Sequence, residues 1–276
     1  MKFQKNIIDV GGCKVSYWEK YSEHKETIIL LHGFPGNHAG LIDLANNLGN
    51  QYRLIIPDLP ACGKSSPLQQ VHTLQHYADW LHASLRMLDI KNPIIIGHSF
   101  GSRVALVYAT HYPSHLKKLV LITPVVTLNG IIPHIASLKG FIAKLLPDYM
   151  RRRWLSNKLY QYAVKMVIFK SASKKRREEI TNIDIQESKN MDVKATIEIF
   201  DEFYRSNLLP LAKKIATPCL VIAGDKDQVA TPASIKRLVA ESDVFSLYML
   251  EKSGHLLPLE RPKLTASIIQ SWLRNS

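Results

Sequence analysis

The 276-residue sequence has few cysteines and no long hydrophobic run. Its three cysteines lie far apart and show no Cys-x-x-Cys spacing, which argues against a disulfide framework and a zinc site. The apolar stretch after the N-terminus is too short for a signal peptide, and no stretch is long enough to span a bilayer. We therefore expect a cytoplasmic protein that does not insert stably into membranes and needs no metal or other cofactor.

Acidic residues are also scarce relative to basic ones. The sequence has 36 Lys and Arg against 23 Asp and Glu, a formal net charge of +13. Two basic clusters, at residues 151–153 and 174–177, could attract nucleic acid, an anionic membrane or an anionic substrate. No recognisable nucleic-acid-binding module accompanies them, so we expect no nucleic-acid partner, and a solvated surface is the simpler interpretation. The sequence does not specify the oligomeric state.

Strand-like and helical patterns alternate along most of the chain. Continuous apolar runs are typical of strands buried on both faces of a parallel sheet, and helical patterns separate them. This alternation predicts an α/β fold with a mostly parallel sheet covered by helices on both faces. Helices are expected at 40–48, 74–88, 100–111, 232–240 and 263–272. The predicted strands are Asn6–Val10, Lys14–Glu19, Thr27–Leu31, Arg53–Pro57, Pro93–Ile96, Leu119–Ile122, Cys219–Ala223 and Phe245–Leu250.

The alternation stops after Pro124 and resumes at Ile215. Between them the sequence is helical in pattern, basic and aromatic, without a strand-like run. Such an insertion would lie at the carboxyl edge of the sheet, where open α/β sheets bind their ligands. We therefore predict a core formed by residues 1–124 and 208–276, and a helical cap, residues 125–207, inserted into it.

The most specific motif is Gly-His-Ser-Phe-Gly at 97–101, between a predicted strand and a predicted helix. In this context the motif is a nucleophile elbow, a sharp turn that exposes Ser99 at the start of the helix. Acyl transfer also needs two N–H donors for the oxyanion. We expect one from Phe100 and the other from Phe34, in the His-Gly-Phe-Pro-Gly loop after the first buried strand. The two phenylalanines also suggest a hydrophobic acyl or aromatic group in the substrate.

A serine nucleophile needs a base, and the base needs a group that fixes its tautomer. His255 follows the last predicted strand and is the candidate base. Asp227 and Asp225 both follow the preceding strand, and we favour Asp227 because Asp225 lies closer to the strand end. His72 and His76 have a metal-like spacing, but no acidic partner completes a metal-binding motif, so we expect no metal site.

With the order Ser99, Asp227, His255, the chain resembles the α/β-hydrolase superfamily, in the branch with a helical cap after the sixth strand. The resemblance covers 1–124 and 208–276 and implies an eight-stranded, mostly parallel sheet. Residues 58–65 are similar to that family's D-x-x-G-x-G-x-S loop, except that Ala61 replaces the first glycine. The departure makes the local shape of this loop an open question.

The resemblance implies a serine esterase that cleaves carboxylic esters of small to medium hydrophobic acyl groups through an acyl-enzyme intermediate. Serine at position 99 disfavours the dehalogenases and epoxide hydrolases of the superfamily, which use an aspartate there. Four alternatives stay open: a lactonase of the acyl-homoserine lactone type, a C–C bond hydrolase, a proline iminopeptidase, and a hydrolase-fold small-molecule receptor with slow turnover.

Overall fold

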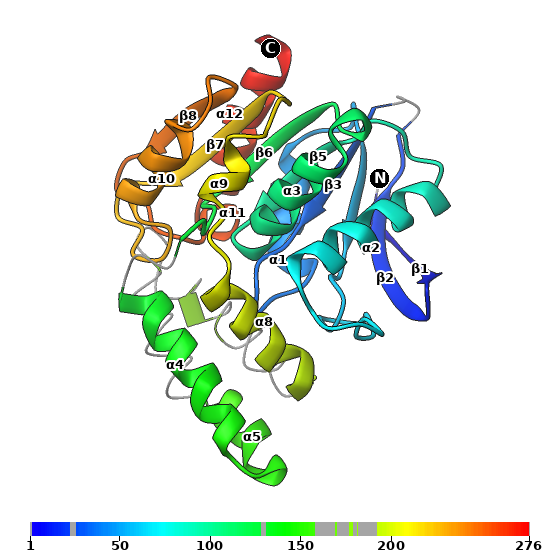
Figure 1. Ribbon diagram of the computed structural model, residues 1–276. Helices are drawn as coiled ribbons and strands as arrows, with labels where there is room; N and C mark the ends of the chain where they lie inside the picture. The colour runs from blue at the N-terminus through cyan, green and yellow to red at the C-terminus, as the bar shows by residue number, and fades with distance from the viewer. Residues whose placement is uncertain are drawn as a thin grey trace.

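The computed structural model describes residues 2–22, 26–127, 131–157, 169, 177–178, 181 and 192–275. In these parts of the chain one eight-stranded sheet is flanked by helices (Figure 1). The strand order is β1-β2-β4-β3-β5-β6-β7-β8. The strands are β1 (Gln4–Val10), β2 (Cys13–Lys20), β3 (Thr27–Leu31), β4 (Arg53–Pro57), β5 (Ile94–His98), β6 (Lys118–Ile122), β7 (Cys219–Gly224) and β8 (Phe245–Leu250).

The sheet is antiparallel at one end and parallel elsewhere. The hairpin of β1 and β2 pairs Val10 with Cys13 around the turn, and β2 pairs antiparallel with β4. All other neighbouring strands run parallel. The predicted α/β fold with an eight-stranded, mostly parallel sheet is therefore confirmed.

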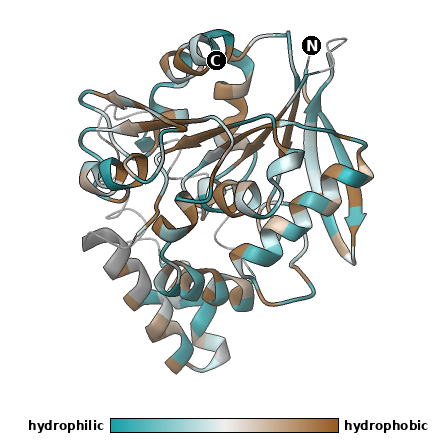
Figure 2. Cartoon of the chain, turned by 45° about the horizontal axis from the view of Figure 1, so that its top comes forward, coloured by the Kyte–Doolittle hydropathy of each residue, from teal (hydrophilic) through white to brown (hydrophobic). Residues whose placement is uncertain are grey.

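Two hydrophobic clusters, one on each face of the sheet, explain the continuous apolar runs. Alternate residues of a strand point to opposite faces, so Ile29 and Leu31 of β3 enter one cluster while Ile28 and Leu30 enter the other. Because both faces are covered, every residue of β3 is buried. Figure 2 shows the hydrophobic strands inside and the mixed helices around them.

The helices divide between the two faces of the sheet. One cluster contains α2 (Leu74–Met87) and α3 (Phe100–His111), and the other contains α1 (Ala39–Asn47) and α12 (Pro262–Asn275). The other helices of the predicted core are short: η1 (Pro113–His115), α9 (Leu209–Ala212), α10 (Pro232–Val239) and α11 (Leu257–Glu260). No helix among the described residues is both long and apolar enough to cross a membrane.

Three of the described helices between β6 and β7 fall within the predicted insertion: α4 (Ile131–Leu145), α5 (Asp148–Leu155) and α8 (Val193–Arg205). They project together from one end of the sheet (Figure 1). Helices α4 and α8 approach each other closely at Gly140, where an added Cβ would lie only 2.7 Å from Cβ of Phe200. Much of the predicted cap, 158–168, 170–176, 179–180 and 182–191, lies outside the described residues, including most of the second basic cluster. The boundaries of the cap stay a prediction.

Candidate active site

The candidate site residues follow the carboxyl ends of parallel strands. The loop with Phe34 follows β3, Ser99 follows β5, Asp227 follows β7 and His255 follows β8. Since these strands are parallel, their carboxyl ends share one edge of the sheet, and residues far apart in sequence meet there. All three predicted triad side chains are buried.

Ser99 occupies a strained turn between β5 and α3. Its φ of 51° lies in the left-handed region, which costs free energy for a residue with a side chain. The turn is possible because its flanking residues are glycines. A Cβ on Gly97 would lie 2.5 Å from the carbonyl oxygen of Gly101, and a Cβ on Gly101 would collide with the carbonyl of Leu31. The Ser99 amide donates to the carbonyl of Ile122 on β6 at 3.0 Å, which fixes the turn to the sheet.

A hydrogen-bonded chain joins Ser99, His255 and Asp227. Nε2 of His255 lies 2.9 Å from Oγ of Ser99, and Nδ1 lies 2.8 Å from Oδ2 of Asp227. A carboxylate can only accept, so Nδ1 donates to Asp227 and Nε2 is left to accept the serine proton. The other oxygen, Oδ1, accepts the amides of Val229 at 2.7 Å and Ala230 at 3.0 Å, which holds the carboxylate in place.

Asp225, the rival acid, has a different partner. Its Oδ1 accepts the Ser253 amide at 3.1 Å, so it holds the loop that leads to His255. Its other oxygen lies 3.6 Å from Nζ of Lys226. The structure therefore brings Asp227, and not Asp225, to the imidazole of His255.

The backbone of His255 is also fixed, by two residues at neighbouring strand ends. Its carbonyl oxygen accepts the hydroxyl of Thr123 at 3.0 Å and Nε2 of His98 at 3.1 Å. Thr123 has a φ of 45°, an unusual backbone conformation for a β-branched residue. The hydrogen bond from His98 makes this elbow residue a positioning contact for His255. Sequence reasoning missed Thr123, for which only its place directly after β6 was a signal.

The loop after β3 lies against the nucleophile. A Cβ on Gly33 would come within 3.2 Å of both Cβ of Ser99 and Nδ1 of His98, so a glycine keeps this approach open. Burial lowers the pKa of His32, which keeps its ring neutral at pH 7. Its Nε2 accepts the Leu59 amide at 2.9 Å, so Nδ1 carries the proton and donates to the carbonyl of Gly33 at 2.8 Å. The two hydrogen bonds of the His32 ring therefore fix the position of the loop that carries Phe34.

The two phenylalanines of the expected oxyanion site have different surroundings. The ring of Phe100 is fully buried and packs against Tyr77 and Phe203, with ring centroids 5.2 and 5.3 Å away. It therefore belongs to the core, contrary to the expectation that it helps to accommodate the substrate. Phe34 is only half-buried and meets Phe200 of α8 at 5.8 Å.

The loop at 58–65 keeps a left-handed turn although it has an alanine where the family has a glycine. Ala61 has a φ of 64°, and its amide donates to the carbonyl of Ser66 at 3.0 Å. Asp58 organises the loop by accepting the Lys64 amide and Nδ1 of His38, each at 2.8 Å. Burial alone would raise the pKa of Asp58, but the hydrogen bonds and charge of its histidine neighbours outweigh burial and lower it.

Arg103 is a second residue that sequence reasoning missed. Its side chain is almost fully buried, and burial lowers its pKa to about 10, so it stays charged at neutral pH. The guanidinium donates to the carbonyls of Val125 and, at 3.1 Å, Ser206, and it lies 4.8 Å from the Phe203 ring centre. A cation within the apolar sequence of α3 was the available signal, since a buried charge requires partners.

The metal-like histidine pair has other contacts. Nδ1 of His72 lies 2.8 Å from the Tyr77 hydroxyl, and Nδ1 of His76 lies 2.7 Å from the Val71 carbonyl oxygen. Within the described ranges, no group of three or more His, Cys, Asp or Glu side chains could hold a metal ion.

Comparison with known proteins identifies the family. A family model described as the alpha/beta hydrolase fold matches residues 26–262. The chain belongs to the α/β-hydrolase family. It is 29% identical to Lipase 3 of Moraxella sp. (strain TA144), over 95% of this chain and 82% of the relative. It is 27% identical to the human monoacylglycerol lipase ABHD6, over 91% of this chain and 76% of the relative.

Solved structures show the same fold. A thermophilic esterase from Thermogutta terrifontis matches with a TM-score of 0.81, covering 99% of this chain and 98% of the esterase at 21% identity. At this identity the likeness concerns the fold alone. As an α/β-hydrolase, the chain has its buried Ser99, His255 and Asp227 at the carboxyl edge of the family's sheet.

Proposed function

We propose that the chain is a carboxylic ester hydrolase in which Ser99 is the nucleophile, His255 the base and Asp227 the group that orients the base. The observation that carries the proposal is the continuous hydrogen-bonded chain from Oγ of Ser99 through His255 to Asp227. The lipase relatives support an ester bond as the target.

The first half of the reaction acylates the serine. His255 takes the proton of Ser99 through Nε2 while Oγ attacks the carbonyl carbon of the ester. The tetrahedral intermediate carries a negative oxygen, which the amides of Phe34 and Phe100 stabilise. His255 then gives its proton to the leaving alcohol, and the acyl group stays on Ser99.

The second half releases the acid. Water takes the place of the alcohol, His255 removes one of its protons, and the oxygen attacks the acyl carbon. Collapse of the second tetrahedral intermediate returns the proton to Ser99 and frees the carboxylic acid. In both halves Asp227 stabilises the cationic imidazole, and the amides of Val229 and Ala230 keep its carboxylate aimed at Nδ1.

The amides assigned to the oxyanion have structural support. Phe100 begins α3, where the first N–H groups of a helix lack partners within the helix. Phe34 follows Gly33, whose Cα hydrogen faces Ser99 and whose carbonyl is held by His32. The half-buried ring of Phe34, in contact with Phe200, favours esters with small to medium hydrophobic acyl groups.

Initial rates on p-nitrophenyl acetate, butyrate and octanoate test this function, with an acyl-homoserine lactone as a cyclic substrate. The Ser99→Ala variant should lose turnover by many orders of magnitude, because only the nucleophile is removed. Ser114→Ala, the same change at an exposed serine, should keep the wild-type rate. Turnover that survives in Ser99→Ala contradicts the proposal. Negligible turnover by the folded wild type on all four compounds would instead favour C–C hydrolysis, a peptidase or a receptor.

A further inference from the structure

Exposed apolar side chains are concentrated on α4 and the start of α5. Of the fourteen large hydrophobic residues that are exposed in the described parts of the chain, six lie between positions 135 and 150. Leu145 and Tyr149 are 70% and 82% exposed. A monomeric protein rarely exposes such a contiguous patch unless the patch binds something. We name these residues the apolar ridge: Ile135, Leu138, Phe141, Leu145, Tyr149 and Met150.

The apolar ridge occupies the face of α4 that does not pack on α8. Four of its members recur at spacings of three and four residues, which aligns them along one side of a helix. The opposite side holds the fully buried Ala143, Gly140 against Phe200, and Lys144, which pairs with Asp201. A surface helix is expected to be polar on the face opposite its packed one, and α4 is apolar there.

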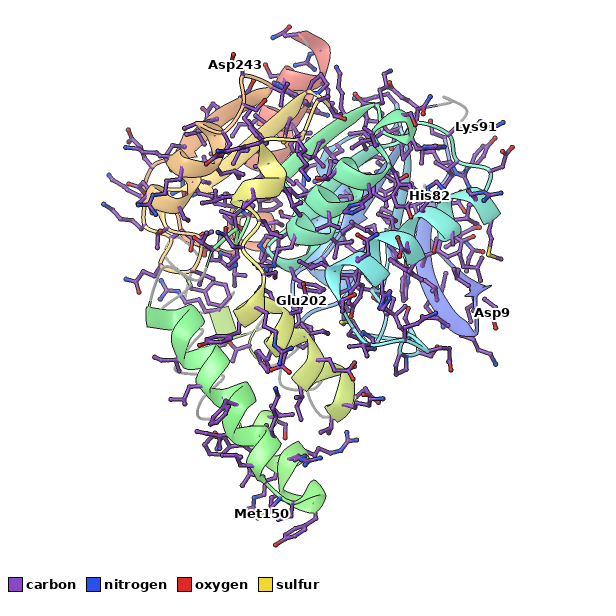
Figure 3. All side chains as sticks on the ribbon, viewed as in Figure 1. Asp9, His82, Lys91, Met150, Glu202 and Asp243 are labelled. Atoms are coloured by element: carbon purple, nitrogen blue, oxygen red, sulfur yellow. The ribbon has the colours of Figure 1, made fainter. Side chains whose placement is uncertain are left out.

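The charge next to the apolar ridge is mainly positive. Helices α4 and α5 contain five basic residues and a single acidic one, Asp148. Lys139 is buried and donates to the carbonyl of Leu155, and Lys144 has its partner on α8. Arg152 and Arg153, two and three residues after Met150, are exposed. The ridge therefore ends in positive charge. In Figure 3, Met150 lies at the end of these helices that is farthest from the sheet.

We propose that the apolar ridge, together with Arg152 and Arg153, docks the protein on the surface of anionic phospholipid membranes. An apolar helix face with flanking arginines enters the boundary between headgroups and acyl chains, and each arginine near the surface adds attraction to anionic lipid. A second copy of this chain fits the surface less well, because it would bring the same arginines and another net charge of +13.

Helix α8 lies between the apolar ridge and the loop beside Ser99. Helix α8 packs against α4 through Phe200, and the same ring meets Phe34 beside the nucleophile. Docking itself does not rest on the proposed function. The role of docking does rest on the proposed function: docking would bring esters dissolved in the bilayer to the catalytic serine.

Co-sedimentation with vesicles tests the charged part of the surface. We compare phosphatidylcholine vesicles with vesicles that also contain phosphatidylglycerol, at low and high salt. Wild type should bind the anionic vesicles, and more weakly at high salt. Arg152→Gln/Arg153→Gln should bind them about thirtyfold more weakly. Arg86→Gln/Lys91→Gln removes the same charge from exposed positions on and after α2 and should bind as wild type does. Lys91 lies far from Met150 in Figure 3.

A second pair tests the apolar part. Phe141→Ser/Leu145→Ser should weaken vesicle binding roughly tenfold or more, because two side chains no longer enter the membrane. Met87→Ser/Leu264→Ser, at exposed positions on α2 and α12, should leave it unchanged. Hydrolysis of p-nitrophenyl acetate without vesicles should be unaffected in every pair, which separates docking from catalysis. Equal binding by test and control pairs, or a dimer that Phe141→Ser/Leu145→Ser dissociates, would overturn the proposal.

Discussion

The buried guanidinium of Arg103 donates a hydrogen bond to the carbonyl oxygen of Val125, where the chain leaves β6 for the inserted helices. A second donor of the same guanidinium reaches Ser206, where the chain returns from α8. The amide of Leu208 also donates to the carbonyl of Val126, at 3.0 Å. Arg103 stands four residues after Ser99 on α3, so one side chain ties the helix of the nucleophile to both ends of the insertion.

Replacing Arg103 should therefore loosen the insertion and destabilise the protein. Arg103→Met leaves two backbone carbonyls without their donors, which should lower the free energy of unfolding by about 2–4 kcal/mol. Arg103→Lys should lose less, since an ammonium can still donate to one of them. Urea unfolding measures both, and Arg86→Met, at an exposed position, is the matched control. If the Arg103→Met protein were as stable as wild type, Arg103 would not stabilise the attachment of the insertion.

The two aspartates after β7 should differ sharply in their effect on turnover. Asp227→Asn replaces the acceptor of the Nδ1 proton, and by analogy with other triads kcat should fall on the order of 10⁴-fold. Asp225→Asn changes a group that contacts Lys226 and the loop before His255 but not the imidazole, so kcat should fall less than tenfold. Steady-state kinetics on p-nitrophenyl butyrate provide the comparison. Equal losses in the two variants would mean that the acid has been assigned wrongly.

Gly33 and Gly40 provide a matched pair for the loop beside the nucleophile. A methyl group on Gly33 would meet Ser99 and His98 at 3.2 Å, so Gly33→Ala should displace the loop slightly and reduce kcat by roughly 10–100-fold. A methyl group on Gly40, in α1, would meet no atom within 4 Å. Gly40→Ala should therefore keep kcat and gain about 1 kcal/mol of stability from helix propensity. Normal turnover in Gly33→Ala would show that this approach is not critical.

Ala61 offers a stabilising substitution. An alanine with a φ of 64° carries a steric cost of about 1–2 kcal/mol that glycine avoids, while glycine loses about 0.5–1 kcal/mol more in chain entropy. Ala61→Gly should thus raise the free energy of unfolding by roughly 0.5–1 kcal/mol and leave turnover unchanged. Chemical denaturation decides the sign. A loss of stability would mean that the alanine methyl group makes contacts that compensate its backbone strain.

The fold was predictable because its signals are local. Strand β3 occupies the predicted residues, and β5 extends two residues beyond its prediction, through His98. Each apolar run is continuous since the two hydrophobic clusters take alternate residues of a strand, a pattern that the sequence displays directly. Ser99, Asp227 and His255 could be predicted as a triad because each follows a strand within a short motif.

The contacts of Arg103 and Thr123 could not be predicted because they join residues far apart in the chain. Arg103 and Ser206 are separated by 103 positions, and Thr123 and His255 by 132. Neither pair of residues lies within a sequence motif, and both contacts depend on how strand ends meet in the folded sheet. The ring of Phe100 illustrates the same limit, since its sequence position beside Ser99 did not reveal that it turns into the core.

The proposed mechanism requires that Ser99 carries the acyl group during turnover. Intact-protein and peptide mass spectrometry of enzyme quenched in acid during turnover of p-nitrophenyl butyrate tests it most directly. We expect a butyryl adduct on the peptide that contains Ser99. The folded Ser99→Ala variant should have no such adduct and should not hydrolyse the ester. Full turnover with no adduct on that peptide, or an adduct on another residue that persists in Ser99→Ala, would contradict it.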